Sequence, residues 1–273
     1  MLNYAVKHRR SNVKPILLFP KTAREKGISE PYNRRTKTNI LIIGDERDKT
    51  VITGSLNQKD GVKTFNSATL DGAGFIGQSF CIRNTAGPEK GQAVALRVTG
   101  DKAALYLCGI EGYQDTLYAH SKNQFYRECY ISGTVDFIFG DATAVFQKCQ
   151  IEARKDGNNN WITAQKRETK DGATVKTYLG RPWGDFARVV FMECDMDDVI
   201  DPYRWADWNK RESTVCYREY KNRGLGAVTS GRVKWEGFRV IRDPKDVEEF
   251  TVRKFLYPDS WLNLTGVPYD EDL

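Results

Sequence analysis

Residues 126–131 read YRECYI, and this pattern of an apolar residue, two others, a cysteine, any residue and a second apolar residue occurs three more times. It is found as LYLCGI at 105–110, FQKCQI at 146–151 and FMECDM at 191–196. The cysteines are 21, 20 and 45 residues apart, which corresponds to one, one and about two units of a period of about 20 residues. A repeat of this length predicts a solenoid, in which each unit covers the apolar face of the next.

Short runs rich in Val, Ile, Phe and Tyr, separated by Gly, Asp and Asn, occur along the whole chain, whereas helical periodicity is scarce. This pattern predicts an all-β fold, a single-stranded right-handed parallel β-helix. A leucine-rich repeat is the competing solenoid, but its Leu and Asn consensus is absent. In a β-helix, residues one period apart lie about 4.8 Å apart on neighbouring coils, so sequence spacing predicts which side chains meet.

The composition limits the classes of partner. With 273 residues, the chain is long enough for one large domain, and two small domains are also possible. Its net charge of +6 is concentrated in residues 1–38, which contain ten Lys and Arg against two Glu, while the other 235 residues contain 32 basic and 34 acidic ones. A basic arm is more typical of a solvated segment than of a nucleic-acid site, so no nucleic-acid partner is expected. No apolar run is long enough to cross a bilayer, and MLNYAVKHRR at the start lacks the apolar core of a signal peptide.

The stretch ISGTVDFIFGDA (131–142) places one carboxylate, Asp136, in an apolar, β-branched run that is typical of a buried strand. Asp115, in GYQDTLY (112–118), precedes it by 21 residues, the same step as between the first two cysteines of the repeat. The two carboxylates should therefore lie on adjacent coils and face the same way. Two carboxylates held together cannot both ionise readily, so one keeps its proton while the other is an anion. Such a pair supplies both an acid and a nucleophile.

The alternative is that Asp115 and Asp136 are turn residues at the ends of coils, where Asp is common. An unpaired buried charge is costly and no turn-forming residue stands next to Asp136 in TVDFIFG, which favours a functional role. Other chemistries lack support, because the chain has no G-x-S-x-G, P-loop, HExxH or dinucleotide motif. Six cysteines without a CxxC pair and two histidines, His8 and His120, make a zinc site improbable. No metal or organic cofactor is expected.

Several segments resemble those of plant-type pectin methylesterases (pectinesterases). They are TFNSAT (64–69), GQAVALRV (91–98), residues 112–151, WITAQ (161–165), TYLGRPWGDFARVVFMEC (177–194), VIDPYRWADWN (199–209) and GAVTSGRVKWEGFRVI (226–241). The resemblance covers a β-helix domain at 35–273 and leaves 1–34 as a divergent basic segment. It implies an enzyme without a cofactor that removes methyl esters from homogalacturonan (pectin) and releases methanol. It also implies an extracellular, cell-wall location for a monomer, with pectin as substrate and a pectin methylesterase inhibitor protein as a possible partner.

The resemblance also implies roles for individual residues. Asp136 is similar to the family's nucleophile, which attacks the ester carbonyl, and Asp115 to the proton donor that later activates water. Gln92 and Gln114 match the amides that stabilise the oxyanion. Arg181, in LGRPW, matches the arginine that keeps the nucleophile ionised.

Four residues match substrate contacts of the family, namely Thr64, Gln92, Arg181 and Trp183. Trp205 and Trp208 could extend an aromatic cleft for sugar rings, but packing in the core is an equal alternative. Cys129 and Cys149 match a disulfide of many family members, although they could equally be buried thiols.

The chain differs from the family's pattern in its first 34 residues, in Asp141 where Asn is usual, and between WITAQKR and TYLGRPW. There it is shorter by about one coil, which should move Arg181 one coil closer to Asp136 or be compensated by a loop. These differences leave open a catalytically impaired homologue that binds pectin or an inhibitor without turnover. A polygalacturonase would need carboxylates further apart, and a pectate lyase a calcium cluster. The acidic run ECDMDD (193–198) is interpreted as the edge of a coil, not as a calcium site.

Overall fold

The computed structural model describes residues 38–62, 68–155, 160–163, 177–207 and 210–273, together with the backbone of 14–18 and 23–24. Thr64 and Trp208, both predicted from the sequence, lie outside the described residues.

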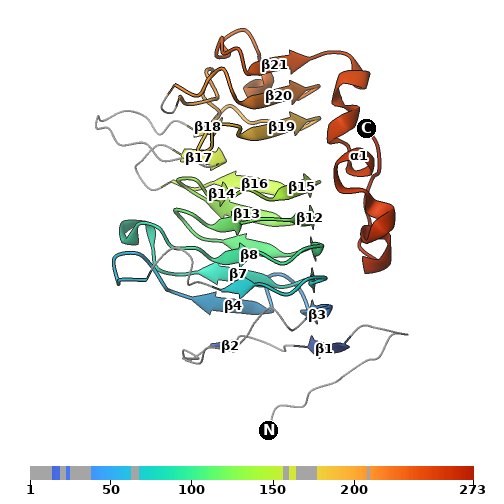
Figure 1. Ribbon diagram of the computed structural model, residues 1–273. Helices are drawn as coiled ribbons and strands as arrows, with labels where there is room; N and C mark the ends of the chain where they lie inside the picture. The colour runs from blue at the N-terminus through green and yellow to red at the C-terminus, as the bar shows by residue number, and fades with distance from the viewer. Residues whose placement is uncertain are drawn as a thin grey trace.

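Three parallel sheets surround a common core (Figure 1). Sheet A contains, in spatial order, β1 (Lys14–Leu18), β3 (Ile40–Ile43), β6 (Ile76–Gln78), β9 (Ala103–Tyr106), β12 (Asn123–Arg127) and β15 (Thr143–Gln147). Sheet B contains β2 (Ala23–Arg24), β4 (Val51–Gly54), β7 (Cys81–Asn84), β10 (Gly109–Glu111), β13 (Tyr130–Gly133) and β16 (Gln150–Ala153). Sheet C contains β5 (Thr69–Leu70), β8 (Leu96–Val98), β11 (Leu117–Ala119), β14 (Ile138–Phe139), β17 (Asn160–Thr163) and β18 (Thr177–Gly180). The chain visits A, B and C in turn, and this circuit is one coil of the predicted parallel β-helix.

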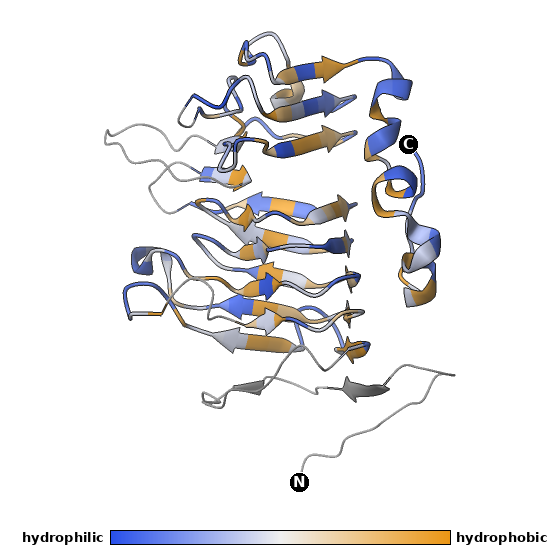
Figure 2. Ribbon diagram, in the orientation of Figure 1, coloured by the Kyte–Doolittle hydropathy of each residue, from blue (hydrophilic) through white to orange (hydrophobic). Residues whose placement is uncertain are grey.

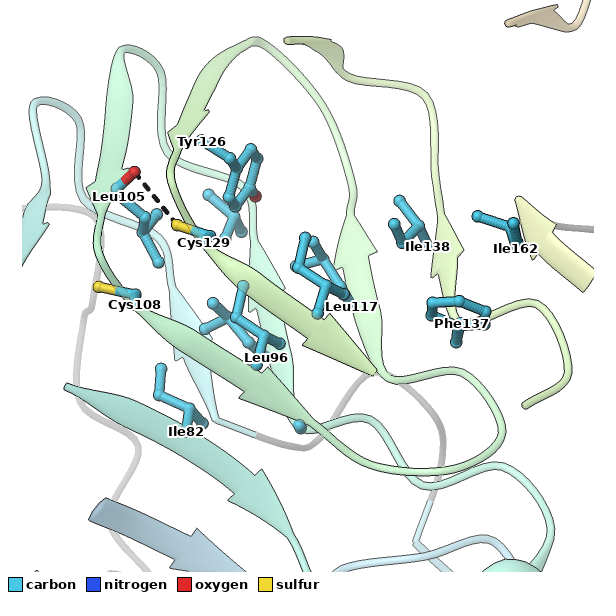
Figure 3. Close-up of a cluster of buried hydrophobic side chains, with 14 of the residues drawn as sticks. Ile82, Leu96, Leu105, Cys108, Leu117, Tyr126, Cys129, Phe137, Ile138 and Ile162 are labelled. Carbon is cyan, nitrogen blue, oxygen red and sulfur yellow. Dashed lines mark hydrogen bonds between the residues drawn. The ribbon is translucent and has the colours of Figure 1, made fainter. Parts of the chain in front are cut away.

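The repeated sequence pattern forms the core. In sheet A, Leu105 pairs with Tyr126, which pairs with Phe146, and in sheet B, Ile110, Ile131 and Ile151 are stacked in the same way. Apolar residues at matching positions of successive coils therefore lie on top of one another inside the solenoid (Figure 3). This arrangement confirms the solenoid that the sequence predicts, with its period of about 20 residues.

Sheets A and B end at β15 and β16, whereas sheet C continues to β18 (Figure 1). The following strands, β19 (Arg188–Met192), β20 (Cys216–Tyr220) and β21 (Phe238–Ile241), form a separate parallel sheet, sheet D. Among the described residues, β15 pairs only with β12 and β19 only with β20. Residues 164–176, between β17 and β18, lie outside the described part of the chain, and among the described residues the coil that contains β18 contributes a strand to sheet C alone. This interruption of two sheets agrees with the predicted shortening between WITAQKR and TYLGRPW.

The interruption exposes part of the core. Tyr126 and Ile131 are fully buried, but Phe146 and Ile151, one coil further on, are only partly buried. Val189 and Phe191 of β19 are partly buried as well, and they belong to the same apolar cluster. The edges of β15 and β16 therefore have fewer packing partners than the coils before them.

Short helices occupy the outside of the solenoid. The 3-10 turns are η2 (Pro88–Lys90), η3 (Leu225–Ala227), η4 (Pro244–Phe250), η5 (Pro258–Ser260) and η6 (Leu262–Thr265), and the α-helix is α1 (Val252–Leu256). Residues of α1 and η6 pack against Ala104 and Phe125 on the outer face of sheet A (Figures 1 and 2). Within the described part of the chain, no helix is long and apolar enough to cross a membrane.

The predicted boundary between 1–34 and 35–273 stays a prediction. Two short strands before that boundary, β1 and β2, pair in parallel with β3 and β4 and so extend sheets A and B.

We expect Ile131→Ala to lower the free energy of unfolding by about 2–5 kcal/mol, because it leaves a cavity in the fully buried stack. Ile151→Ala should cost less, since this side chain at the interrupted edge is already partly exposed. Val228→Ala, at a side chain that is 62% exposed, serves as the control and should change stability by no more than about 0.5 kcal/mol. Urea unfolding of the three variants measures these differences. Equal losses for Ile131 and Ile151 would show that the edge is as closed as the interior.

Candidate active site

Asp115 and Asp136 occupy matching positions on adjacent coils, as their spacing predicts. Each lies in the bend that joins a strand of sheet B to the next strand of sheet C. The Asp115 N–H donates to the carbonyl of Val135 at 2.9 Å, and the Leu117 N–H donates to the carbonyl of Phe137 at 2.8 Å. The two bends are therefore hydrogen-bonded to each other.

The expectation that Asp136 stands inside a continuous buried strand is wrong. Strand β13 ends at Gly133 and β14 begins at Ile138, so Asp136 belongs to the bend between them. Asp115 and Asp136 have φ angles of 61° and 51°, in the left-handed region that Asp adopts more readily than most residues. They are also buried, with exposed fractions of 4% and 6%. Turn position and burial thus occur together, and turn geometry alone does not account for a buried carboxylate.

The environment separates the protonation states of the two carboxyl groups. Burial raises the pKa of Asp115 well above its usual value, the charge of Asp136 raises it further, and Arg181 opposes this increase to a smaller extent. Asp136 instead accepts two hydrogen bonds from Arg181, from Nε at 2.9 Å and from Nη2 at 2.7 Å. This bidentate charge-assisted pair favours an ionised Asp136 beside a protonated Asp115.

Arg181 directly follows β18, which pairs in register with β17 in sheet C. Its side chain is almost fully buried, and its guanidinium lies 4.0 Å from the ring centroid of Trp161. Because sheet C is continuous from β14 to β18, the interruption of sheets A and B leaves the Arg181–Asp136 contact in place. The predicted displacement of Arg181 by a whole coil is therefore not seen, because its guanidinium still binds Asp136.

Gln92 and Gln114 lie in bends on consecutive coils and are partly buried. The carbonyl of Gln114 accepts the N–H of Ala93 at 3.1 Å, which connects the two bends directly. Gln114 immediately precedes Asp115 in the chain. Gln114 is thus adjacent to the carboxylate pair in the chain, and Gln92 lies on the preceding coil. The action of both amides on an oxyanion stays a prediction.

A row of aromatic rings continues from the carboxylate pair along the outer face of sheet C. Tyr118 and Phe139 pair across β11 and β14, and their rings are stacked with centroids 4.4 Å apart. Trp183 follows at 6.3 Å from Phe139 and is 47% exposed. The sequence analysis missed Tyr118 and Phe139, although each stands three residues after one of the aspartates, and the shared offset could have revealed them.

Trp205 does not extend this row. It is 2% exposed and stacks on Tyr217 with centroids 4.0 Å apart, so the core alternative is confirmed for this residue.

The predicted disulfide between Cys129 and Cys149 is not formed in this structure. All six cysteines are free thiols. The neighbouring Cys129 thiol, followed by burial, raises the pKa of Cys149, and each of the two thiols donates to backbone carbonyls, including those of Leu105 and Tyr126. Stacking on consecutive coils thus brings the two sulfurs together, while the hydrogen bonds to carbonyls satisfy them as thiols.

The described residues contain no group of three or more His, Cys, Asp or Glu side chains that could hold a metal ion. In the acidic run at 193–198, Asp195 forms an ion pair with Arg223 at 3.1 Å.

Comparisons with known proteins identify the family of the chain. A sequence model of the Pectinesterase family matches residues 29–174 and 169–259. The chain is 52% identical over 263 residues to "Probable pectinesterase 30" of Arabidopsis thaliana, a match that covers 87% of this chain and 53% of that protein. It is 50% identical over 264 residues to "Pectinesterase 2.1" of Solanum lycopersicum, covering 87% and 48%. The chain therefore spans about half the length of these curated relatives.

Solved structures are similar as well. Pectin methylesterase from carrot matches with a TM-score of 0.87 and 40% identity, covering 96% of this chain and 90% of that one. A pectin methylesterase in complex with a hexasaccharide matches with a TM-score of 0.66 and 26% identity, covering 97% and 92%. These likenesses confirm the predicted right-handed parallel β-helix.

We expect Asp115→Asn to raise the free energy of unfolding at pH 7 and to change it little near pH 3. The pKa of Asp115 is higher in the folded protein than in the unfolded chain, so its carboxyl group destabilises the fold increasingly as the pH rises above about 4. An asparagine cannot ionise and removes this penalty. Urea unfolding at both pH values measures the effect, with the exposed Asp198→Asn as the control. A gain of the same size at pH 3 would contradict the raised pKa.

Proposed function

The chain belongs to the pectinesterase family, and from this premise we propose that it hydrolyses the methyl esters of homogalacturonan to pectate and methanol. The observation that carries this proposal is the bidentate Arg181–Asp136 ion pair beside the buried Asp115, whose pKa is raised. One carboxylate is thus prepared as a nucleophile and the other as an acid, although both are aspartates.

In the proposed reaction, a carboxylate oxygen of Asp136 attacks the carbonyl carbon of the ester. The tetrahedral intermediate carries a negative oxygen, to which the amides of Gln92 and Gln114 would donate hydrogen bonds. Asp115 gives its proton to the methoxy group, which leaves as methanol, and an anhydride joins the substrate to Asp136. Asp115, now a base, takes a proton from water as the water attacks the anhydride. The product acid is released, and both aspartates return to their initial states.

The surroundings of the pair support a sugar polymer as substrate. The ring of Trp183 is 47% exposed and offers a flat apolar face to solvent, while the neighbouring rings of Tyr118 and Phe139 are stacked on each other and buried. The similar pectin methylesterase that was solved with a hexasaccharide supports the same class of ligand. We propose pectin as the substrate and the plant cell wall as the location. Two relatives are named "Probable pectinesterase/pectinesterase inhibitor", which supports an inhibitor protein as a second partner.

A second candidate function is that of a homologue that binds pectin without turnover. The interruption of sheets A and B next to the coil of Arg181 favours it, because a displacement of about 1 Å at a catalytic group can cost on the order of a hundredfold in rate. The intact contact between Arg181 and Asp136 favours the enzyme.

We expect the purified chain to release methanol from highly methylated homogalacturonan and Asp136→Asn to release at least about a thousandfold less, because an amide is not a nucleophile for this reaction. Asp115→Asn should lose about a hundredfold to ten-thousandfold, as expected for removal of a general acid. Circular dichroism of each variant controls for folding.

If the folded parent chain binds methylated pectin but releases no methanol, the enzyme proposal is wrong and the second candidate, a homologue that binds pectin without turnover, replaces it. Full activity of Asp136→Asn would refute its role as the nucleophile.

Trp183→Ala should raise KM several-fold and change kcat by less than about twofold, because an exposed stacking ring contributes to substrate binding in the ground state and the transition state alike. Phe186→Ala, at a ring that is 83% exposed and close to Trp183 in the chain, is the matched control and should leave both constants unchanged. An equal rise of KM in both variants would argue against a specific stacking role for Trp183.

A further inference from the structure

Trp161 is connected to both members of the central ion pair. It lies in β17, between the strand that follows Asp136 and the strand that precedes Arg181. The backbone N–H of Trp161 donates to the carbonyl of Thr134 at 3.1 Å, and the backbone carbonyl of Trp161 accepts the N–H of Phe137 at 3.4 Å. These two hydrogen bonds hold the bend of Asp136 from both sides.

The side chain of Trp161 contacts Arg181, the other member of the ion pair. The guanidinium of Arg181 lies over the ring of Trp161 at 4.0 Å from the centroid, and the ring of Tyr178 is stacked with it at 5.9 Å with an interplanar angle of 14°. The indole is 8% exposed, and its N–H has no hydrogen-bond partner among the described residues. A buried indole N–H normally finds a partner, so this position does not use the polar end of the ring. What the indole offers here is its face.

We propose that Trp161 is a positioning residue, whose indole face holds the guanidinium of Arg181 in the orientation that forms both hydrogen bonds to Asp136. The inference rests on the proposed function for its kinetic consequences, while the geometry that it invokes exists without turnover. A guanidinium that is removed from water interacts strongly with the face of a tryptophan, and its planar fork must be oriented to bind a carboxylate with two bonds. Trp161 thus acts on the nucleophile through Arg181.

The proposal predicts a change in the pH dependence of the reaction. The charged groups placed against Asp136 include Arg181, which follows β18, and Asp115, in the bend before β11. A loosened Arg181 would favour the ionised Asp136 less, while Asp115 would be unchanged in position. The acid limb of kcat/KM reports the ionisation of the free enzyme's base or nucleophile. This limb should therefore move to higher pH when the indole face is lost.

The test compares Trp161→Leu, which removes the aromatic face but keeps apolar bulk, with Trp161→Phe, which keeps a smaller face. Tyr178→Leu is the matched control, because it disturbs the same layer and leaves the indole beneath Arg181. Methanol release is measured as a function of pH for the parent and the three variants. We expect Trp161→Leu to lower kcat by about ten- to thirtyfold with KM within about twofold, and to displace the acid limb upward by about one pH unit. Trp161→Phe should restore most of both effects, and Tyr178→Leu should have the acid limb of the parent.

A loss of general packing would give a different result. If Trp161→Leu has the acid limb of the parent, or if Trp161→Phe is no better than Trp161→Leu, the proposal is wrong. A parent chain without activity would refute the proposed function but not this inference. The test is then the NMR chemical shift of the Arg181 Nε–H proton, whose resonance is assigned by its loss in Arg181→Lys. The ring current of the indole should shift this proton in the parent and in Tyr178→Leu, and the shift should disappear in Trp161→Leu. An unchanged resonance in Trp161→Leu would overturn the proposal.

Discussion

The in-register stacking of parallel coils is the constraint on which the rest of the molecule depends. Each coil can bury its inner face only against the coils next to it, so matching positions must be apolar for as long as the stack continues. The same constraint brings together polar residues that are one period apart in the bends outside the core. Asp115 and Asp136 meet for the same reason as Ile110 and Ile131. Core and site are therefore two results of one register.

This register explains what could be predicted from the sequence. The cysteine pattern indicated the period, and the period predicted both the buried stack and the adjacency of the two aspartates. Arg181 is 45 residues from Asp136, about two periods, but this spacing does not say that its side chain reaches back to Asp136, and only the resemblance to pectinesterases identified it. The bend around Asp136 was not predicted, because Val, Phe and Ile on both sides of it are typical of a strand. These apolar residues are buried against neighbouring coils although the backbone turns there, since burial and strand geometry are separate requirements.

The interruption of sheets A and B shows how locally the site is built. The residues that contact Asp136 come from the bends between sheets B and C and from sheet C itself, where β14, β17 and β18 are consecutive. Among the described residues, the other two sheets have no strand after β15 and β16, where Phe146 and Ile151 are partly buried, whereas this ladder is continuous. The packing of sheets A and B and the geometry of the site on sheet C can therefore vary independently. Spacing alone could not establish this, because it does not say which sheets lose a strand.

The left-handed backbone of the two aspartates limits which residues these positions accept over evolutionary time. Glycine, asparagine and aspartate tolerate such φ angles most readily, and of these only aspartate carries a negative charge. Glutamate adopts the same conformation elsewhere in this chain, at Glu128 and Glu193, so the turn favours aspartate without excluding glutamate. The chemistry of the buried pair adds the requirement for a carboxyl group. A descendant of this fold that no longer needed the reaction would have an easy path to asparagine or glycine at both positions, so these two residues would record the loss of function before the fold did.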